Sequence, residues 1–343
     1  MMTGQAAQAV FFTAPESVVL QSLQLPPLAA GQVLLKTRYS AISAGTESLI
    51  FRGQFPASGQ QDVNIASLQG SFDYPFQYGY ALTGEIIEVA EGVTKDWLGK
   101  RVFAFHPHQD YAVVTLQDCW LIPDEMSLEA ALFLPNVESA LNFVMDAAPL
   151  IGEQVMVIGQ GVVGLLTTRI LADFPLAALI GVEPLAYRRE VAQQIGAVTA
   201  NPNDPVSWQR LLKQVFSTQQ PGIDLAIELS GSAQGLNQAL SMTGFGGRII
   251  LASWYGDKPQ SLHLGADFHR RRIQLLSSQV SSLNPKLTGR WDKARRMRLA
   301  WRTIQKIHPE KFISHRFAAA QCQQAFELAN RRYDGALQVI LEY

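Results

Sequence analysis

The chain has 343 residues, which at roughly 150 residues per domain predicts about two domains and argues against a single small binding module. Hydrophobic residues make up 48% and charged residues 17% of the chain, and 26 Gly with 17 Pro are too few for a fibrous or disordered protein. The 28 basic and 29 acidic side chains give a net charge of −1, which disfavours nucleic acid or an anionic membrane as main partner and favours a small-molecule substrate.

The cysteines and the N-terminus bear on the cellular compartment. Cys119 and Cys322 lie far apart in the sequence, so neither a disulfide framework nor a CxxC-type zinc site is expected. The N-terminal MMTGQAAQAVFF lacks the basic start and long apolar run of a secretory signal, and no apolar run is long enough to span a membrane. These features predict a cytoplasmic protein.

Residues 1–125 predict a β-rich domain. Short segments with apolar alternation or β-branched runs, separated by Gly and Pro, lie at 33–43, 84–93, 100–105 and 110–115. From residue 126 the pattern changes to helical spacing, with Ser127 and Glu129 at a typical helix start. We therefore place a second domain at 126–280.

The second domain alternates apolar strands with amphipathic helices. The predicted strands lie at 154–159, 176–182, 224–230, 248–253 and 273–278. Continuous apolar strands of this kind indicate a parallel sheet covered on both faces, and hence an α/β fold. The remainder, 281–343, contains predicted helices and a closing strand.

The strongest local pattern is Gly159-Gln-Gly161-Val162-Val163-Gly164, which follows an apolar strand and opens a helix. Gly159 permits the tight turn, Gly161 lets a pyrophosphate approach the backbone, and Gly164 allows helix and strand to pack closely. The helix N-terminus at Val162 and Val163 then faces the phosphates. A Gly-rich turn without a ligand is the alternative, but the flanking elements favour a dinucleotide site.

Glu183 bears on which nicotinamide cofactor is used. It ends the strand after the glycine turn, where a carboxylate accepts hydrogen bonds from an adenosine ribose and repels a 2′-phosphate. NAD is therefore the predicted cofactor. NADP stays the alternative because Arg188 and Arg189 follow closely and are able to receive a phosphate, unless they belong to a solvated helix face.

Several motifs resemble the medium-chain dehydrogenase/reductase superfamily, namely 40–54, 78–89, 99–105, the glycine turn and 246–256. The resemblance covers nearly the whole chain. It implies a GroES-like β-barrel catalytic domain at 1–125, completed by 281–343, and a Rossmann domain with a doubly wound parallel sheet at 126–280. It also implies that Ser230, Ser253 and Trp254, at the ends of later strands, contact the cofactor.

The chain departs from the zinc enzymes of this superfamily. At the places of their catalytic ligands it has Ser43, Tyr80 with Ala81, and about Pro135, none of which supplies the thiolate, imidazole or carboxylate that zinc prefers. A zinc-lacking branch is implied, with no metal ligands. Paired histidines at His106 and His108 are the alternative metal site.

Without a metal, side chains must move the proton that accompanies hydride transfer. Tyr80 occupies the place of a zinc ligand, His106 follows a barrel strand, and Glu138 begins the helix entering the cofactor domain. We predict these three as catalytic residues, with His108 and Glu47 nearby. Their ordinary alternatives are a core aromatic, a polar loop and a helix-start residue.

Within the superfamily, several segments resemble bacteriochlorophyllide dehydrogenase-like proteins, which oxidise a hydroxyethyl group on a tetrapyrrole. The predicted function is a zinc-independent oxidoreductase that transfers hydride between a nicotinamide cofactor and an alcohol or ketone in an interdomain cleft. The alternatives are an NADPH-dependent quinone or enoyl reductase and a non-catalytic dinucleotide-binding protein. The edge strand 273–278 predicts a homodimer, and the arginines at 270–272 and 295–298 are interpreted as solvated faces.

Overall fold

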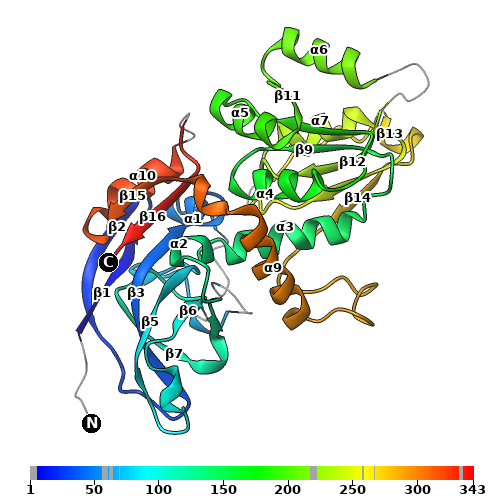
Figure 1. Ribbon diagram of the computed structural model, residues 1–343. Helices are drawn as coiled ribbons and strands as arrows, with labels where there is room; N and C mark the ends of the chain where they lie inside the picture. Colours follow the sequence, from blue (N-terminus) through cyan, green and yellow to red (C-terminus); the bar gives the residue numbers. More distant parts are fainter. Residues whose placement is uncertain are drawn as a thin grey trace. The chain divides into compact units, whose positions relative to one another are not determined.

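A computed structural model describes residues 6–55, 61, 65–68, 70–216, 222–256, 259–265, 267–331 and 335–343 (Figure 1). The chain divides into two compact units. The first comprises Met1–Pro135, Ile304–Arg332 and Ala336–Tyr343, and the second comprises Asn136–Thr303 and Tyr333–Gly335.

The first unit is built from two sheets, in which the strands pair antiparallel except for the parallel pair β15 and β16. A three-stranded sheet has the order β2-β1-β4, and a larger sheet has the order β15-β16-β3-β5-β6-β8, with β7 also paired to β3. The strands are β1 (Ala6–Ala14), β2 (Ser17–Gln24), β3 (Gln32–Ile42), β4 (Phe76–Gln77), β5 (Leu82–Val89), β6 (Arg101–Ala104), β7 (Tyr111–Thr115), β8 (Cys119–Leu121), β15 (Ile313–Ala318) and β16 (Gln338–Glu342). The helices of this unit are α1 (Thr46–Phe51), α2 (Leu128–Ala131) and α10 (Cys322–Asn330), with 3-10 turns η1 (Ala66–Leu68), η2 (Lys95–Trp97), η3 (Leu116–Asp118), η4 (Pro309–Phe312) and η5 (Ala319–Gln321).

The end of the chain is an integral part of the first unit. Strand β16 pairs with β3 in antiparallel register, with Leu341 opposite Ser40, and lies beside it in Figure 1. Val339 and Leu341 pack in one core with Phe12, Phe51 and the buried residues of α10. Burying these side chains drives the last strand onto a sheet whose other members come from the first part of the sequence.

The second unit contains one parallel six-stranded sheet in the order β11-β10-β9-β12-β13-β14. Its strands are β9 (Gln154–Ile158), β10 (Ala178–Val182), β11 (Val198–Ala200), β12 (Ile223–Glu228), β13 (Thr243–Leu251) and β14 (Gln274–Ser277). The helices that accompany it are α3 (Leu134–Ala147), α4 (Val162–Leu171), α5 (Ala186–Ile195), α6 (Pro205–Val215), α7 (Ala233–Met242), α8 (Asp267–Arg270) and α9 (Lys293–Ile307).

Two apolar cores cover the two faces of this sheet. Phe143 of α3 and Leu171 of α4 pack against one set of strand residues, while Leu211 of α6 and Leu236 of α7 pack against the other. Every residue of the central strand β9 is buried, as its uninterrupted apolar run predicts. The predicted α/β fold with a doubly wound parallel sheet is confirmed.

The compact units divide the chain at other points than the sequence motifs. Residues 126–135 lie in the first unit, where α2 packs on its strands and Arg101 donates to the carbonyl of Met126. Residues 281–303 lie in the second unit, because Arg296 of α9 bonds to α3. Within the part of the chain that is described, no helix is long and apolar enough to cross a membrane.

Candidate functional site

The glycine turn of the second unit lies between β9 and α4, and two of its glycines are fixed by sterics. Gly159 has φ +91°, and a Cβ there would lie 2.8 Å from the backbone of Leu229 and Ser230. A Cβ on Gly164 would lie 2.0 Å from the carbonyl oxygen of Gly159. A side chain at either position would therefore displace backbone, and the turn keeps its close approach only with glycine.

Gly161 is different, because no backbone atom of another element lies within 4 Å of a Cβ placed there. It forms the N-cap of α4, and within 4 Å of a Cβ placed there the nearest group is the Arg188 guanidinium, with Nη1 at 3.7 Å. The amides of Val162 and Val163 begin the helix directly after it. The turn thus presents a helix N-terminus with an open approach, the geometry that binds pyrophosphate.

The side chain of Gln160 supports the turn from inside the protein. It is wholly buried, donates from Nε2 to the carbonyl of Val157 at 3.0 Å and accepts from the Thr168 hydroxyl at 2.9 Å. Because both of its polar atoms are bonded to neighbouring elements, this residue fixes the turn rather than contacting a ligand.

Glu183 lies at the carboxyl end of β10, beside this turn. Its carboxylate accepts from the backbone amide of Gln160 at 2.8 Å and from that of Leu185 at 3.1 Å. Arg189 donates to the carbonyls of Glu183 and Pro184, at 2.9 and 2.6 Å. Its guanidinium is therefore hydrogen-bonded to the backbone that follows β10. The structure thus places Glu183 beside the glycine turn, and its contact with a cofactor stays a prediction.

A second polar network joins the carboxyl ends of β12 and β13. The buried carboxylate of Glu228 accepts from the amide and hydroxyl of Ser230 and, at 2.8 Å, from the hydroxyl of Tyr255. Ser253 Oγ accepts from the amide of Gly231 at 3.1 Å and donates to the carbonyl of Glu228 at 3.4 Å. Burial, together with the charge and hydrogen bond of Glu228, raises the pKa of Tyr255, so its hydroxyl stays protonated.

Ser230 and Ser253 of this network are predicted cofactor contacts, whereas Glu228 and Tyr255 are not among the predicted site residues. Glu228 was visible as an acidic residue at the end of a buried strand, the same signal that identified Glu183. The sequence contains no such signal for its partner Tyr255, because the bond joins residues that follow two different strands.

In the first unit the polar centre is a buried pair, His108 and Glu47. Both side chains have no exposed surface, and His108 Nε2 lies 2.7 Å from Glu47 Oε2. The other ring nitrogen lies 2.8 Å from the hydroxyl of Ser40, which in turn lies 3.0 Å from the hydroxyl of Tyr343. The amide of Ser43 donates to the second carboxylate oxygen of Glu47 at 3.1 Å.

Gly79 makes room for the imidazole of this pair. It has φ +130°, and a Cβ there would lie 2.7 Å from His108 Cδ2. The predicted Tyr80 follows it, half-buried against the core of the first unit, with its ring centroid 6.4 Å from that of Tyr78. His108 is therefore packed on the backbone that carries Tyr80.

His106 is a neutral histidine in this structure. Burial lowers its pKa to about 4, although a backbone hydrogen bond to Pro107 acts in the opposite direction. Its Nδ1 lies 3.2 Å from the carbonyl of Pro107 and donates to it in the neutral ring, which leaves Nε2 as an acceptor.

The third predicted catalytic residue, Glu138, lies in a buried ion pair of the second unit. Its carboxylate accepts from Arg296 Nη2 at 2.7 Å and Nε at 3.1 Å. Arg296 also donates to Asn142 Oδ1 at 2.5 Å and to the carbonyl of Val280 at 2.6 Å. Its place in this ion pair gives Glu138 a structural role in joining α3 to α9, and its predicted part in proton transfer stays a prediction.

The residues present do not fit a catalytic zinc ion. Among the described residues, no group of three or more His, Cys, Asp or Glu side chains is arranged to hold a metal. Ser43, Tyr80 and Ala81 supply no ligand that zinc prefers, and His108 is engaged by Glu47 and Ser40.

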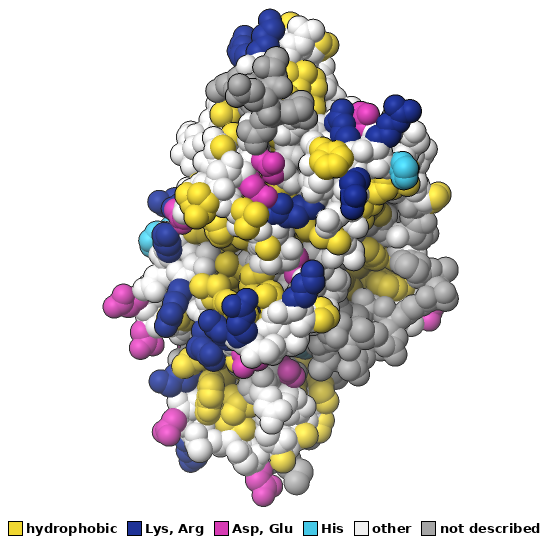
Figure 2. All heavy atoms as spheres, turned by 90° about the vertical axis from the view of Figure 1, so that its right-hand side faces the viewer, with side chains coloured by type: hydrophobic (Ala, Val, Ile, Leu, Met, Phe, Trp, Pro, Cys, Tyr) yellow, Lys and Arg dark blue, Asp and Glu magenta, His cyan; other side chains and the backbone are white. Residues whose placement is uncertain are grey.

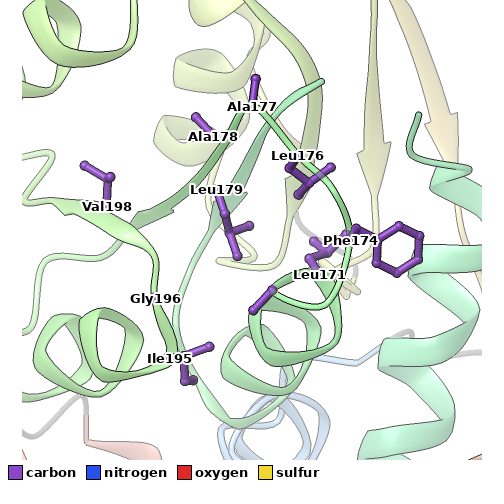
Figure 3. Close-up of a pocket in the computed structure, with 10 residues that line it drawn as sticks. Leu171, Phe174, Leu176, Ala177, Ala178, Leu179, Ile195, Gly196 and Val198 are labelled. Carbon is purple, nitrogen blue, oxygen red and sulfur yellow. The ribbon is translucent and has the colours of Figure 1, made fainter. Parts of the chain in front are cut away.

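One cavity of the second unit lies away from the glycine turn. It has a volume of about 420 Å³ and is lined by residues at the start of β10 and β11 and the ends of α4 and α5 (Figure 3). The side chains of Leu171, Phe174, Leu179 and Ile195 around it are apolar. Ligands of open α/β sheets bind at the carboxyl ends of the strands, and this cavity is at the opposite ends.

Comparison with known proteins gives one family-model match. Residues 162–297 match the family described as zinc-binding dehydrogenase. Among curated proteins, the chain is 25% identical over 305 residues to D-guloside 3-dehydrogenase of Escherichia coli K12, covering 85% of this chain and 86% of that protein. It is 26% identical over 236 residues to (R,R)-butanediol dehydrogenase of Bacillus subtilis, covering 61% and 65%.

Solved structures of similar fold include two dehydrogenases with bound cofactor. RspB from E. coli CFT073, an alcohol dehydrogenase complexed with NADH, matches with a TM-score of 0.78 and 20% identity over 99% of this chain and 100% of that one. A zinc-binding dehydrogenase from Sinorhizobium meliloti bound to NADP matches with a TM-score of 0.76 and 18% identity, over the same shares. These similarities establish the fold of the whole chain.

Proposed function

We infer from the matched family model and these relatives that the chain is an enzyme of the zinc-binding dehydrogenase family, within the medium-chain dehydrogenase/reductase superfamily. We propose that it transfers hydride between a nicotinamide cofactor and an alcohol or ketone. The observation that carries the proposal is the open glycine turn at Gly161, with Glu183 beside it at the carboxyl ends of the parallel strands.

The residues of the second unit fit a dinucleotide. A Cβ at Gly159 or Gly164 would fill the turn, while Gly161 and the α4 amides leave space for a pyrophosphate. Glu183 would accept from ribose hydroxyls, and Ser230, Ser253 and Trp254 would flank the other half of the molecule at the ends of β12 and β13. When bound, the nicotinamide supplies the hydride acceptor or donor.

We propose NAD as the preferred cofactor. Although Glu183 already accepts two backbone hydrogen bonds, each carboxylate oxygen has a further lone pair for a ribose hydroxyl. The same carboxylate would repel a 2′-phosphate. Arg188 near Gly161 is the feature that favours the alternative, an NADPH-dependent quinone or enoyl reductase.

We propose that the reaction proceeds without zinc and that Tyr80 or His106 handles the hydroxyl proton. Neutral His106 has Nε2 as an acceptor, and Tyr80 sits on backbone that His108 supports. The resemblance to bacteriochlorophyllide dehydrogenase-like proteins supports the zinc-lacking branch. Pairing of edge strand β14 in a homodimer also belongs to this proposal.

Cofactor titration with the Glu183→Gln variant tests the proposal. Unmodified protein should bind NADH more tightly than NADPH, by about 1–3 kcal/mol, because the 2′-phosphate meets a carboxylate. The isosteric amide should narrow that difference, whereas Glu190→Gln on the exposed side of α5 should leave it unchanged. Turnover of secondary alcohols with NAD in excess EDTA completes the test.

Three results would contradict parts of the proposal. Tighter binding of NADPH by the unmodified protein would favour the reductase alternative. Loss of turnover in EDTA would contradict zinc independence. Binding of neither nucleotide would overturn the function itself.

A further inference from the structure

We propose that an exposed row of arginines on α9, formed by Arg295, Arg298 and Arg302, is a docking surface for an acidic α-helix of a partner protein. All three side chains are exposed, and the helix that carries them is labelled in Figure 1. The row belongs to the second unit. The inference adds a binding surface to this unit and does not depend on hydride transfer.

Helical geometry places the three arginines in one line. At about 100° per residue, Arg295, Arg298 and Arg302 fall within about 60° of the helix circumference. At about 1.5 Å per residue they are about 4.5 and 6 Å apart along the axis. Arg296, one residue from the row, is buried and bonds to Glu138. The buried side of α9 is therefore held by this ion pair, while the opposite side presents the row to solvent.

The positive charge of the row is not neutralised within the second unit. Among the residues that the structure describes, none forms an ion pair or hydrogen bond with the guanidinium of Arg298 or Arg302. Arg295 lies over the ring of Trp291, at 4.0 Å from its centroid. Asp292, the acidic residue nearest in the sequence, accepts from the backbone amide of Arg295 at 2.6 Å and so caps the helix. Three cations are thus available to a partner.

This arrangement is unfavourable for the helix itself. Cations three or four residues apart on one face repel each other. The N-terminal end of a helix, where Arg295 lies, favours anions, yet the first turn of α9 contains no acidic residue. A local rule that is broken without a compensating contact inside the protein is expected at a functional surface.

The spacing of the row matches the carboxylates of another helix. Acidic residues at positions i, i+3 and i+7 of an α-helix repeat at the same axial distances as Arg295, Arg298 and Arg302, because both elements have the same rise per residue. Each guanidinium is able to hold a carboxylate through two parallel hydrogen bonds. A helix lying alongside α9 would therefore pair with all three arginines at once.

Other anionic partners fit the row less well. Met297 and Ala300 of α9 are buried within the protein, so the helix has no free apolar face to enter a lipid layer. A long nucleic acid would extend beyond a row of about 10 Å onto a chain whose net charge is −1. A short acidic helix meets only the cations.

Binding of synthetic helical peptides tests the inference. The probe is a fluorescein-labelled, alanine-rich helix with Glu at positions i, i+3, i+7 and i+11, and a second peptide of the same composition has its Glu residues scattered around the helix. Fluorescence anisotropy at low salt measures the affinity of each. We expect the aligned peptide to bind about fivefold or more tightly than the scattered one, and added salt to weaken its binding because exposed charges are screened.

Variants of the row locate the binding surface. Arg298→Gln with Arg302→Gln should weaken binding of the aligned peptide about tenfold, because two of the three charge-assisted pairs are lost. The matched control Arg169→Gln should leave the affinity within about twofold, since Arg169 is already paired with Asp173. Affinity for NADH and the circular dichroism spectrum should be the same in all variants, which shows that they are folded.

Charge reversal gives a second test. Arg298→Glu with Arg302→Glu should no longer bind the Glu peptide and should bind a peptide that has Lys at the same aligned positions. Equal affinity for the aligned and scattered peptides would overturn the docking of a helix. Unchanged affinity in the double Gln variant would exclude the row as the site. Tighter binding of a short single-stranded RNA, or of phosphatidylglycerol vesicles, than of the aligned peptide would overturn the choice of partner.

Discussion

At the scale of single residues, the polar groups of the first unit are paired by contacts that cross long stretches of sequence. His108 meets Glu47 and Ser40, and Ser40 meets Tyr343 at the end of the chain. His108, Glu47 and Ser40 are buried and Tyr343 is partly buried, so their polar atoms need partners within the protein, and the folded chain supplies them. None of these pairings follows from local spacing, because the partners come from β3, α1, the segment after β6 and the last residue.

His106 makes the stability of the protein depend on pH. Its pKa is about 4 when folded and 6.5 ordinarily, so the unfolded chain binds more protons between these values and stability falls as pH decreases through them. We expect this residue alone to remove up to about 2 kcal/mol between neutral pH and about pH 5. His106→Asn should remove that part of the dependence.

Urea unfolding at several pH values measures the effect. The difference in unfolding free energy between neutral and acid pH should be smaller in His106→Asn than in the unmodified protein. The matched control is His308→Asn, whose ring is mostly exposed and should change the dependence little. Parallel curves for His106→Asn and the unmodified protein would contradict the burial argument.

At the scale of elements, the ion pair between α3 and α9 explains why 281–303 belongs to the second unit. Arg296 has almost no exposed surface, and its guanidinium bonds to Glu138, Asn142 and Val280. The sequence interpretation of the arginines at 295–298 as a solvated face is right for Arg295 and Arg298, which are exposed, and wrong for Arg296, which is buried. Helical spacing alone does not show which one points inward.

Breaking this pair should destabilise the protein rather than slow its chemistry. Glu138→Gln leaves a buried guanidinium without its counter-charge, and we expect a loss of about 3 kcal/mol in the free energy of unfolding. The double variant Glu138→Leu with Arg296→Met should recover at least half of that loss, since apolar groups replace both charges. Chemical denaturation measures both. A Glu138→Gln variant that is as stable as the unmodified protein but turns over much more slowly would instead assign Glu138 to proton transfer.

The strands and the glycine turn were predictable because each has a largely local physical cause. An uninterrupted apolar run such as 155–158 is buried on both faces of a sheet. Gly164 is required by the carbonyl of Gly159 only five residues before it, and Gly159 by its own positive φ as well as by the more distant backbone of Leu229 and Ser230. The start of β13 at Thr243 was missed, because Gly244, Gly246 and Gly247 resemble a loop. The Glu228–Tyr255 bond was missed as well, since pairing between strands depends on the sheet order rather than on spacing.

At the scale of the whole molecule, charge is distributed very unevenly. Residues 268–309 hold 11 of the 28 Lys and Arg but one of the 29 Asp and Glu. Arg295, Arg298, Arg302 and Lys306 follow one face of α9 and are exposed. Figure 2 shows a face of the molecule on which Lys and Arg side chains gather near the middle.

This segment should retain the protein on a cation-exchange column although its overall isoelectric point is about 6.6. At about pH 7.5 we expect binding at low salt, because the charged groups of the column interact with protein charges within about a Debye length, and these are the clustered Lys and Arg side chains. The double variant Arg298→Gln with Arg302→Gln should elute at lower salt. Arg169→Gln should elute unchanged, since Arg169 is paired with Asp173. Flow-through of the unmodified protein would show that the charges do not act together.

The pairing of β16 with β3 dictates the order in which the protein is able to fold during its synthesis. The second unit uses a nearly continuous stretch, so its sheet is complete as soon as α9 has left the ribosome. The first unit is translated first but lacks β15 and β16 until the last residues are made. Until then Ile42 and Ser40 of β3 have no partners, because Val339 and Leu341 pair with them. Its nascent strands therefore stay unpaired along one edge for most of translation, and that edge is where chaperones or misfolding would act.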